Sequence, residues 1–539
     1  MKKVTYVYWI GMVIAVVFVI WGVVFPENIT NVMETSKAFL LEQFGWFYLL
    51  ATFFFLIFAI YLIFSKYGKV KLGKDEDEPE YSRASWIAML FSAGMGIGLL
   101  FYGISEPIAH LVTPPFGEAG TTETAKVALQ YTYLNWGIHA WAIYAVVALA
   151  LAYFKFRKDA PGIMSATLYP ILGEKTKGPI GITVDIIAVF ATVFGVAASL
   201  GLGAAQINGG LSYLTGIPNA FWIQVIIILV TTALFILSAS TGINKGIKYL
   251  SNANMVLAVV LFVAFLLLGP LQFVISLLMT TLGGYIQNLP MMSFRMAPFN
   301  QENAAWVQNW TIFFFAWWIA WAPFVGTFIA RISKGRTIRE FIIVVMVVPT
   351  AVCILWFGVF GGTGIYYELF QGANIAGQGV ETALFATFNM MPGSGILSTI
   401  ALLLIATFFI TSADSATFVL GMQTTNGSLH PPNFVKISWG LFLTASALIL
   451  MGRGGLSGLQ TAIIVSALPL TVILLLMSIS ILKELGEEPV EELRLEKKLE
   501  KIREKRKRKQ MKGNLQTEFG EEHDINSKLR RAKKNKEDK

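Results

Sequence analysis

The chain has 539 residues, of which 55% are hydrophobic and 14% are charged. A composition this apolar excludes a soluble globular protein and indicates a polytopic membrane protein. The formal net charge of +9 lies mostly in short loops and in the tail after Lys483, so nucleic acid is a poor candidate partner. Cys353 is the only cysteine and lies in an apolar stretch, so one chain can form neither an internal disulfide nor a thiolate metal site.

Apolar runs of about 20 residues, the length that spans a bilayer, recur twelve times along the chain. We therefore predict an all-α polytopic membrane protein with 12 transmembrane helices. The predicted spans are residues 7–25, 45–64, 85–106, 133–154, 183–211, 219–240, 252–270, 304–330, 339–361, 395–421, 435–452 and 457–482. The segment 271–291 is apolar but is interrupted by Gly283, Gly284 and Pro290, so we expect an interfacial helix there and not a further span.

Basic residues gather in the loops after the second, fourth, sixth and eighth spans and are scarce in the loops between. They are Lys66, Lys69, Lys71, Lys74, Arg83, Arg157, Lys158, Lys175, Lys177, Lys245, Lys248, Arg331, Lys334, Arg336 and Arg339. Because basic loops stay in the cytoplasm, both termini are predicted to be cytoplasmic.

The third span contains alternate glycines at Gly94, Gly96 and Gly98. Each costs a regular helix about 1 kcal/mol relative to alanine. Close packing of helices by small residues and an unwound segment whose carbonyls line a cavity and coordinate a cation are equally compatible with this spacing. Glu106 precedes Pro107, and we expect it to end the third span near the outer surface.

The eighth span includes the uncharged stretch from Asn309 to Gly326, which holds four tryptophans and four phenylalanines. Trp310, Trp317 and Trp321 fall on one helical face, and Trp318 lies about 100° around the helix. Aromatic faces attract a quaternary ammonium ion without hydrogen bonding. The segment therefore indicates a carrier for a methylated ammonium solute.

Spans 3 to 7 and 8 to 12 form two groups of five. An odd number of spans in each unit inverts the second unit relative to the first. We therefore predict two leading helices with their cytoplasmic loop at 1–84, a first repeat at 85–303, an inverted second repeat at 304–482 and a charged cytoplasmic tail at 483–539.

Three motifs together resemble the betaine/choline/carnitine transporter family: the glycines from Gly94 to Gly98, the tryptophan segment, and TSADSA from Thr411 to Ala416. The resemblance covers nearly the whole membrane part, although Phe315 stands where the family signature has another tryptophan. It implies the fold of two leading helices plus an inverted repeat of five, and a homotrimer.

The resemblance implies an aromatic substrate cage with Trp136, Trp141 and Tyr144 on one wall and Trp318 on the other. On a single helix the first three would lie within an arc of about 140°. Trp321 matches a family position on the exit route, and Trp317 one that makes a transient substrate contact. An interfacial aromatic belt is the better explanation for Trp136 taken alone. Rings suit a zwitterion because they add no net charge, and its carboxylate can use backbone donors at Gly94, Gly96 and Gly98.

The resemblance also implies a sodium site, because Na⁺ requires a shell of oxygen ligands. Thr411 and Ser412 would supply hydroxyls, and Ser92, Met95 and Phe408 would supply carbonyls. The competing explanation is that both hydroxyls bond back to their own helix. Thr192 and Phe324 match candidates for a second sodium site, but Val196 stands where some members have a threonine, so the number of ions stays open.

Asp414 is an intramembrane carboxylate, and we expect it to organise the helix around the ion site. The tail stretch LEKKLEKIREKRKRK predicts a charged helix that could lie on anionic lipid. A disordered tail is equally compatible with the part after Gly513. A role for the tail in sensing osmotic stress rests on family analogy alone.

Together these features predict a multi-pass protein of the bacterial cytoplasmic membrane. We expect it to import glycine betaine as an osmoprotectant, coupled to sodium, by alternating access, without an organic cofactor and without enzymatic activity. The alternatives are a sodium-independent exchanger of carnitine-type solutes and a membrane sensor that binds ammonium compounds. The hydroxyls of Thr411 and Ser412 argue against the exchanger, and the lack of a recognisable signalling domain argues against the sensor.

Overall fold

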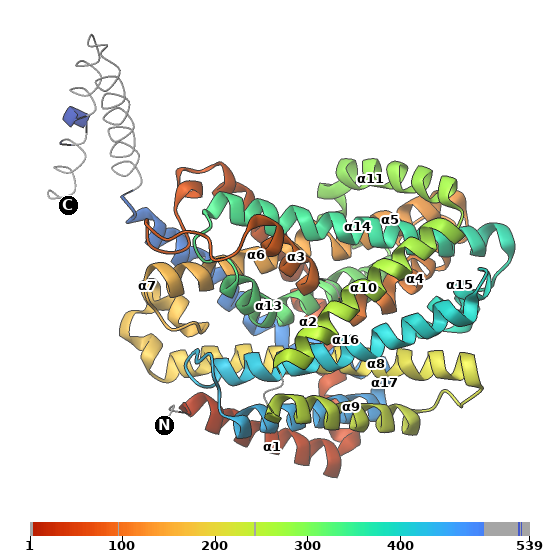
Figure 1. The fold of residues 1–539 in the computed structure, drawn as a ribbon, viewed down its shortest axis with the longest axis horizontal. Helices are drawn as coiled ribbons and strands as arrows, with labels where there is room; N and C mark the ends of the chain where they lie inside the picture. Colours follow the sequence, from red (N-terminus) through yellow and green to blue (C-terminus); the bar gives the residue numbers. More distant parts are fainter. Residues whose placement is uncertain (1–3, 95, 242–243, 490–525, 529, 531–539) are drawn as a thin grey trace, which may run out of the picture.

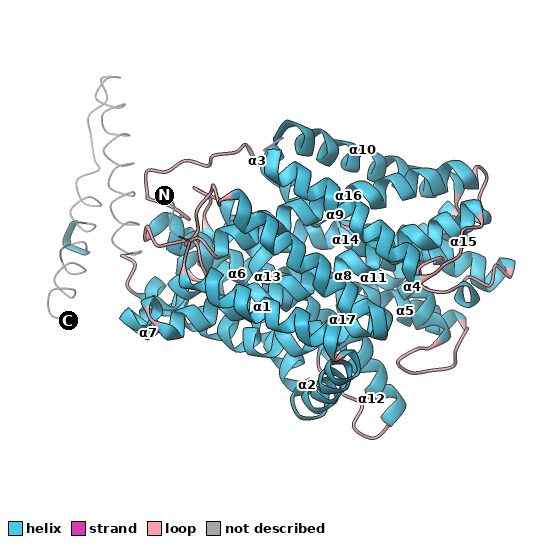
Figure 2. Cartoon of the chain, turned by 90° about the horizontal axis from the view of Figure 1, so that it is seen from below, coloured by secondary structure: helices cyan, strands magenta, loops and turns pink. Residues whose placement is uncertain are grey.

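The structure is a computed structural model that describes the chain except residues 1–3, 95, 242–243, 490–525, 529 and 531–539. Long helices run roughly side by side and are joined by loops (Figures 1 and 2). Within the described residues the only β pairing is a single bridge between Lys71 and Thr337. The charged helix predicted between Leu495 and Lys509 lies outside the described residues.

Seventeen α-helices are present in the described part of the chain. They are α1 (Tyr6–Val24), α2 (Pro26–Phe64), α3 (Arg83–Gly94), α4 (Ile97–Val112), α5 (Thr122–Trp136), α6 (Ile138–Ala152), α7 (Tyr169–Leu172), α8 (Pro179–Thr215), α9 (Phe221–Thr241), α10 (Asn244–Leu268), α11 (Leu271–Ser293), α12 (Gln301–Val307), α13 (Phe313–Arg331), α14 (Ile338–Gln371), α15 (Ala383–Asn389), α16 (Ser394–Gln423) and α17 (Asn433–Gly486).

Eleven helical segments in the described residues are long and apolar enough to cross a membrane. They correspond to every predicted span except the third, which is divided into α3 and α4, and α4 is a shorter apolar helix. The prediction of an all-α polytopic membrane protein is confirmed, whereas the count of 12 is not. The predicted interfacial segment forms α11, which is not among the eleven segments.

Two further interruptions lie inside or between predicted spans. The predicted fourth span is broken at Gly137, which separates α5 from α6. A Cβ atom at Gly137 would lie 2.3 Å from the carbonyl oxygen of Tyr133, so only glycine fits this break. The eleventh and twelfth spans both lie within α17 and are separated by a kink at Gly455, whose φ of 55° and ψ of −138° are not helical.

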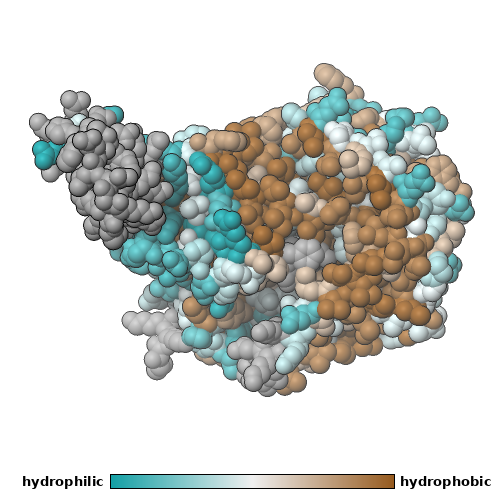
Figure 3. All heavy atoms as spheres, turned by 45° about the horizontal axis from the view of Figure 1, so that its top comes forward, coloured by the Kyte–Doolittle hydropathy of each residue, from teal (hydrophilic) through white to brown (hydrophobic). Residues whose placement is uncertain are grey.

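The helices enclose a buried core, and an apolar surface surrounds it. Helix α17 packs along α8, α6 along α13, and α4 along α14, while α11 lies on the outside against α5 and α14 (Figure 1). Figure 3 shows hydrophobic side chains in a broad band between hydrophilic regions, as expected for a surface that faces lipid. Helix α1 begins and α17 ends at the same end of the bundle (Figure 1).

Candidate functional site

The described helices surround a large cavity with a volume of about 780 Å³. It is lined by the start of α4, the end of α5, one face of α6, the middle of α13 and the TSADSA segment of α16. Its lining includes Gly96, Gly98, Trp136, Trp141, Tyr144, Trp317, Trp318, Trp321, Phe324, Phe408, Thr411 and Ser412. Most of the residues predicted for the site therefore meet around one space.

The break at Gly137 shapes the first aromatic wall. Trp136 is the last residue of α5, whereas Trp141 and Tyr144 lie on α6, so the expectation that one helix carries all three is wrong. The backbone N–H of Ile138, freed by the break, donates to the hydroxyl of Tyr285 on α11 over 3.4 Å. Trp141 and Tyr144 pack edge to face with ring centroids 5.4 Å apart.

Helix α13 supplies the opposite wall. Trp317 and Trp318 are stacked with ring centroids 5.3 Å apart and an interplanar angle of 7°. The ring of Trp321 lies edge-on to that of Trp317 at 6.3 Å. The ring of Trp136 closes the corner against Trp318 at 4.8 Å, so the two walls are in direct contact. Phe315 does not line the cavity and instead stacks on the buried His139 ring.

The glycine segment is broken, as one of the two explanations predicted. Helix α3 ends at Gly94, Gly96 is extended with a φ of −161°, and α4 begins at Ile97. The first N–H groups of α4 therefore lie beside the cavity, where helix N-termini favour anionic groups. Met95 lies outside the described residues, and the side chain of Ser92 is likewise not described.

Gly98 sits in the first turn of α4 and makes a close approach to the aromatic cage. A Cβ atom at Gly98 would lie 2.8 Å from Cη2 of Trp136 and 3.5 Å from Cη2 of Trp317. A Cβ atom at Gly96 would meet no heavy atom within 4 Å. Gly98 therefore serves the close packing of α4 on the cage, whereas Gly96 faces open space.

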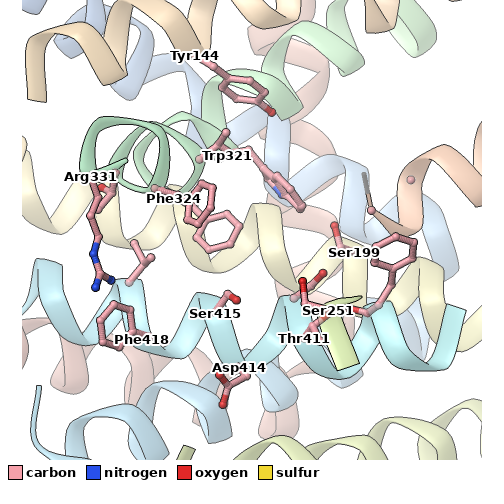
Figure 4. Close-up of a pocket in the computed structure, with 18 of the residues that line it drawn as sticks. Tyr144, Ser199, Ser251, Trp321, Phe324, Arg331, Thr411, Asp414, Ser415 and Phe418 are labelled. Carbon is pink, nitrogen blue, oxygen red and sulfur yellow. Dashed lines mark hydrogen bonds between the residues drawn. The ribbon is translucent and has the colours of Figure 1, made fainter. Parts of the chain in front are cut away.

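Oxygen-bearing side chains gather on α16 and its neighbours (Figure 4). The hydroxyls of Thr411 on α16, Ser199 on α8 and Ser251 on α10 all line the cavity. Nδ2 of Asn254 donates to Oγ1 of Thr411 over 3.2 Å. The Thr411 hydroxyl also lies 3.0 Å from the carbonyl oxygen of Thr407, so it is bonded to its own helix while its oxygen remains beside the cavity.

The two candidates for a second sodium site, Thr192 and Phe324, differ in their relation to the cavity. Phe324 lines the cavity, but Thr192 does not, and the hydroxyl of Thr192 donates to the carbonyl oxygen of Ala188 within its own helix.

Asp414 lines the cavity on the far side of α16 from Tyr144 and Trp321 (Figure 4). It is therefore remote from the aromatic cage.

The cavity continues away from the cage towards the loops at one end of the bundle. Arg331, at the end of α13, places its guanidinium 5.7 Å from the ring centroid of Phe418 on α16 (Figure 4). His430 and Lys436, in and after the loop between α16 and α17, also line this end. Only Arg331 belongs to the basic loops that predict the orientation, and the sequence alone did not indicate that these three residues line a vestibule of the cavity.

Glu106 is a residue whose position was predicted wrongly. Helix α4 continues to Val112 with Pro107 inside it, and the Glu106 side chain is fully buried. Proline after a glutamate suggested a helix end, but the carboxylate is held by side chains of α5 that the local sequence does not reveal.

Known proteins provide an independent comparison. The family model described as betaine/carnitine/choline family transporter matches residues 6–490. The chain belongs to this family. The glycine betaine transporter OpuD of Bacillus subtilis is 52% identical over 498 residues, which cover 92% of this chain and 97% of that protein. A probable glycine betaine transporter of Desulfitobacterium hafniense and an ectoine/hydroxyectoine transporter of Virgibacillus pantothenticus are each 44% identical, covering 90% of this chain and 98% of each relative.

Membership in the betaine/carnitine/choline family makes the chain a membrane transporter and not an enzyme. Because the match spans nearly all described helices, it applies to the cavity as a whole. The relatives carry different solutes in their names, so the solute of this chain has to be argued from the residues of its own cage.

Proposed function

We propose that this transporter imports glycine betaine together with sodium by alternating access. The observation that carries the proposal is the aromatic cage, in which Trp136, Trp318 and the stacked Trp317 face a cavity that also receives the N-terminus of α4. The relatives named as glycine betaine transporters support the same solute.

The two ends of glycine betaine match different parts of this cavity. Its trimethylammonium group cannot donate a hydrogen bond, and desolvated ring faces bind such a group with about 2 kcal/mol or more. Its carboxylate suits the free N–H groups and positive dipole end of α4 beside Gly96. The solute would therefore bind with its cation between the rings and its anion at the helix break.

A sodium site is proposed where α16 approaches this break. Thr411, Ser412 and Phe408 line the same cavity as Gly96, and hydroxyl and carbonyl oxygens suit a hard cation. The backbone carbonyls of Ser92 and Met95 are the remaining ligands proposed for this site. For a second sodium ion, Phe324 is available at the cavity, whereas the Thr192 hydroxyl is engaged in its own helix.

The inverted repeat and the alternating access that it permits also remain proposals. Each predicted repeat begins with an interrupted helix: α3 and α4 in the first, and in the second a π-helical turn at Gln308–Ile312 between α12 and α13. Paired interruptions at corresponding positions are typical of inverted-repeat transporters. A homotrimer, cytoplasmic termini and contact of the tail with anionic lipid complete the proposed arrangement.

Uptake by purified protein in liposomes tests the proposal. An inward sodium gradient should drive accumulation of labelled glycine betaine, and replacing sodium by potassium should abolish it. Ectoine, choline and carnitine serve as competitors, because a relative is named for ectoine transport. Equal counterflow of carnitine-type solutes with and without sodium would instead support the exchanger, and binding without uptake would support a sensor.

A further inference from the structure

Glu106 holds a buried carboxylate behind the aromatic cage. Its Oε2 accepts a hydrogen bond from Nε1 of Trp136 over 2.6 Å, and its Oε1 accepts one from Nδ2 of Asn135 over 2.8 Å. Nε2 of His110 lies 3.3 Å from Oε1. An ionised carboxylate only accepts hydrogen bonds, and each of these three nitrogens can donate one. These three donors offset the cost of burying a carboxylate in a membrane protein, and an intramembrane carboxylate is a candidate functional residue.

The carboxylate connects both walls of the cage. Its amide donor, Asn135, and its indole donor, Trp136, are the last two residues of α5 before the break at Gly137. The carbonyl oxygen of Asn135 in turn accepts a hydrogen bond from Nε1 of Trp318 over 2.6 Å. Trp136 and Trp318 line the cavity, whereas Glu106 and Asn135 do not. Both indole N–H groups are therefore used behind the cage, and the rings are free to meet a solute.

The position of the charge also matters for the solute. A hydrogen bond to a carboxylate polarises the indole and raises the electron density of its ring, which strengthens its attraction for a cation. Glu106 lies nine residues after Ile97, about 14 Å along α4. Helix α4 thus presents a positive dipole end at the break and a negative charge behind the rings, a polarity that matches the orientation proposed for glycine betaine.

We propose that Glu106 is a positioning residue that fixes the Trp136 indole and makes the cage selective for a quaternary ammonium group. The inference rests on the proposed function of the same cavity. Neutralising the carboxylate should weaken binding of any solute with a positive trimethylammonium group. Choline, which has no negative end, should lose more affinity than the zwitterion.

Glu106→Gln tests the charge at nearly constant volume. In purified protein we expect glycine betaine affinity to fall about tenfold and choline affinity to fall further, so that the ratio of the two dissociation constants changes. Glu106→Asp keeps the charge and should retain more affinity than the glutamine variant. Asp185→Asn is the matched control: its buried carboxylate accepts from the backbone N–H and the hydroxyl of Ser165, away from the cavity, and both affinities should stay unchanged.

A double-mutant cycle tests whether Glu106 acts through the indole. Trp136→Phe keeps an aromatic ring but removes the N–H donor. Residues that act as one unit give non-additive effects, so the double variant Glu106→Gln/Trp136→Phe should bind little worse than either single variant. If Glu106→Gln does not fold, Trp136→Phe alone carries the test, and it should weaken glycine betaine binding.

Three results would overturn the inference: unchanged affinities and an unchanged choline to betaine ratio in folded Glu106→Gln, strictly additive effects in the cycle, or unaltered glycine betaine binding by Trp136→Phe. A failure of the proposed function looks different, because the unmodified protein would then not bind glycine betaine at all.

Discussion

The Trp318 side chain both forms part of the aromatic cage and donates a hydrogen bond to a neighbouring helix. Its ring stacks on Trp317 and meets Trp136, while its indole N–H donates to the backbone of Asn135 at the end of α5. A substitution here therefore removes an aromatic face and also releases the hydrogen bond that joins α13 to α5.

Trp318→Leu should weaken glycine betaine binding severely while the protein still inserts into the membrane. Leucine stays apolar but removes a cation–π face worth about 1–2 kcal/mol, which corresponds to roughly tenfold in affinity. Trp222→Leu is the control, because Trp222 is 59% exposed on α9 and lies outside the cavity lining. Tryptophan fluorescence titration of both variants measures the difference, and wild-type affinity in Trp318→Leu would remove Trp318 from the cage.

We predict that the protein prefers glycine betaine over choline, because no carboxylate at Gly98 is available to pair with the net charge of choline, and that Gly98→Asp narrows this preference. A nearby carboxylate pairs with the net positive charge of choline, but the new Cβ atom also forces the Trp136 ring to shift, because the two would lie 2.8 Å apart. We therefore expect lower affinity for glycine betaine and a relative gain for choline. Gly98→Ala separates the effects, since it shifts the ring without adding charge. Competition binding that leaves the preference unchanged in Gly98→Asp would contradict the prediction.

For whole helices, the predicted spans agree with the structure wherever the length and apolarity of a segment determine that it is helical. The positions of the helix breaks agree less well, because tertiary contacts determine them. The alternate glycines marked the break between α3 and α4, but nothing in the sequence near Gly137 revealed that Tyr285 of a distant helix accepts the hydrogen bond of Ile138. The cage residues were found through family resemblance, whereas the role of Glu106 depends on contacts with α5 that spacing cannot reveal.

The prediction for sodium coupling concerns two hydroxyl residues of helix α16. Thr411→Ala and Ser412→Ala should raise the sodium concentration needed for half-maximal uptake, and Thr411→Ala should have the larger effect. Thr399→Ala on the same helix is the control, because its exposed hydroxyl bonds only to its own helix, at the carbonyl of Gly395. Uptake measured against sodium concentration tests the pair, and unchanged sodium dependence in both variants would move the ion site elsewhere.

At the scale of the whole molecule, an ion-pair cluster connects the end of α17 to the end of α6. Arg157 donates to both carboxylate oxygens of Glu488 over 2.6 and 2.7 Å, and the Tyr153 hydroxyl donates to the same group over 2.6 Å. Burial alone would raise the pKa of Glu488. The combined effect of the nearby donors and positive charges is larger and opposite, so the pKa of Glu488 lies below its ordinary value. A nearby ion pair joins Lys158 to Glu484 over 2.6 Å.

Glu488→Gln should lower the stability of the protein by about 2 kcal/mol, because it weakens two charge-assisted hydrogen bonds and leaves Arg157 with only its contacts to the Gly73 carbonyl and Asp75. Since the folded pKa is lowered, this stabilisation is present above the ordinary carboxyl pKa of about 4.3 and is lost as the pH falls through the folded value. Thermal unfolding of both proteins across pH 3–7 measures it. The difference in stability between the unmodified protein and Glu488→Gln should disappear only below about pH 4. Glu174→Gln, which removes a carboxylate from an exposed pair with Lys177, should show no difference in stability at any of these pH values.

Removal of the tail should shift the osmolality at which uptake begins without changing the substrate affinity of the active state. The cluster fixes where to cut: truncation after Pro489 keeps Glu484 and Glu488, whereas truncation after Leu482 removes both and should also destabilise the protein. Uptake in liposomes of varied anionic lipid content tests this. The same activation curve for the full chain and the Pro489 truncation would leave the tail without a regulatory role.

If the transporter has the proposed orientation, the vestibule that runs from the cage to Arg331 and Lys436 also determines where the membrane voltage acts. On the predicted orientation, water in this vestibule would carry the cytoplasmic potential to the rings, and most of the electric field would fall across the buried region around Glu106 and His110. A single charge that crosses this region moves through about 2.3 kcal/mol per 100 mV, while a zwitterion that crosses it carries no net charge. Voltage would then act on the ion alone, and at a different step from the release of the solute.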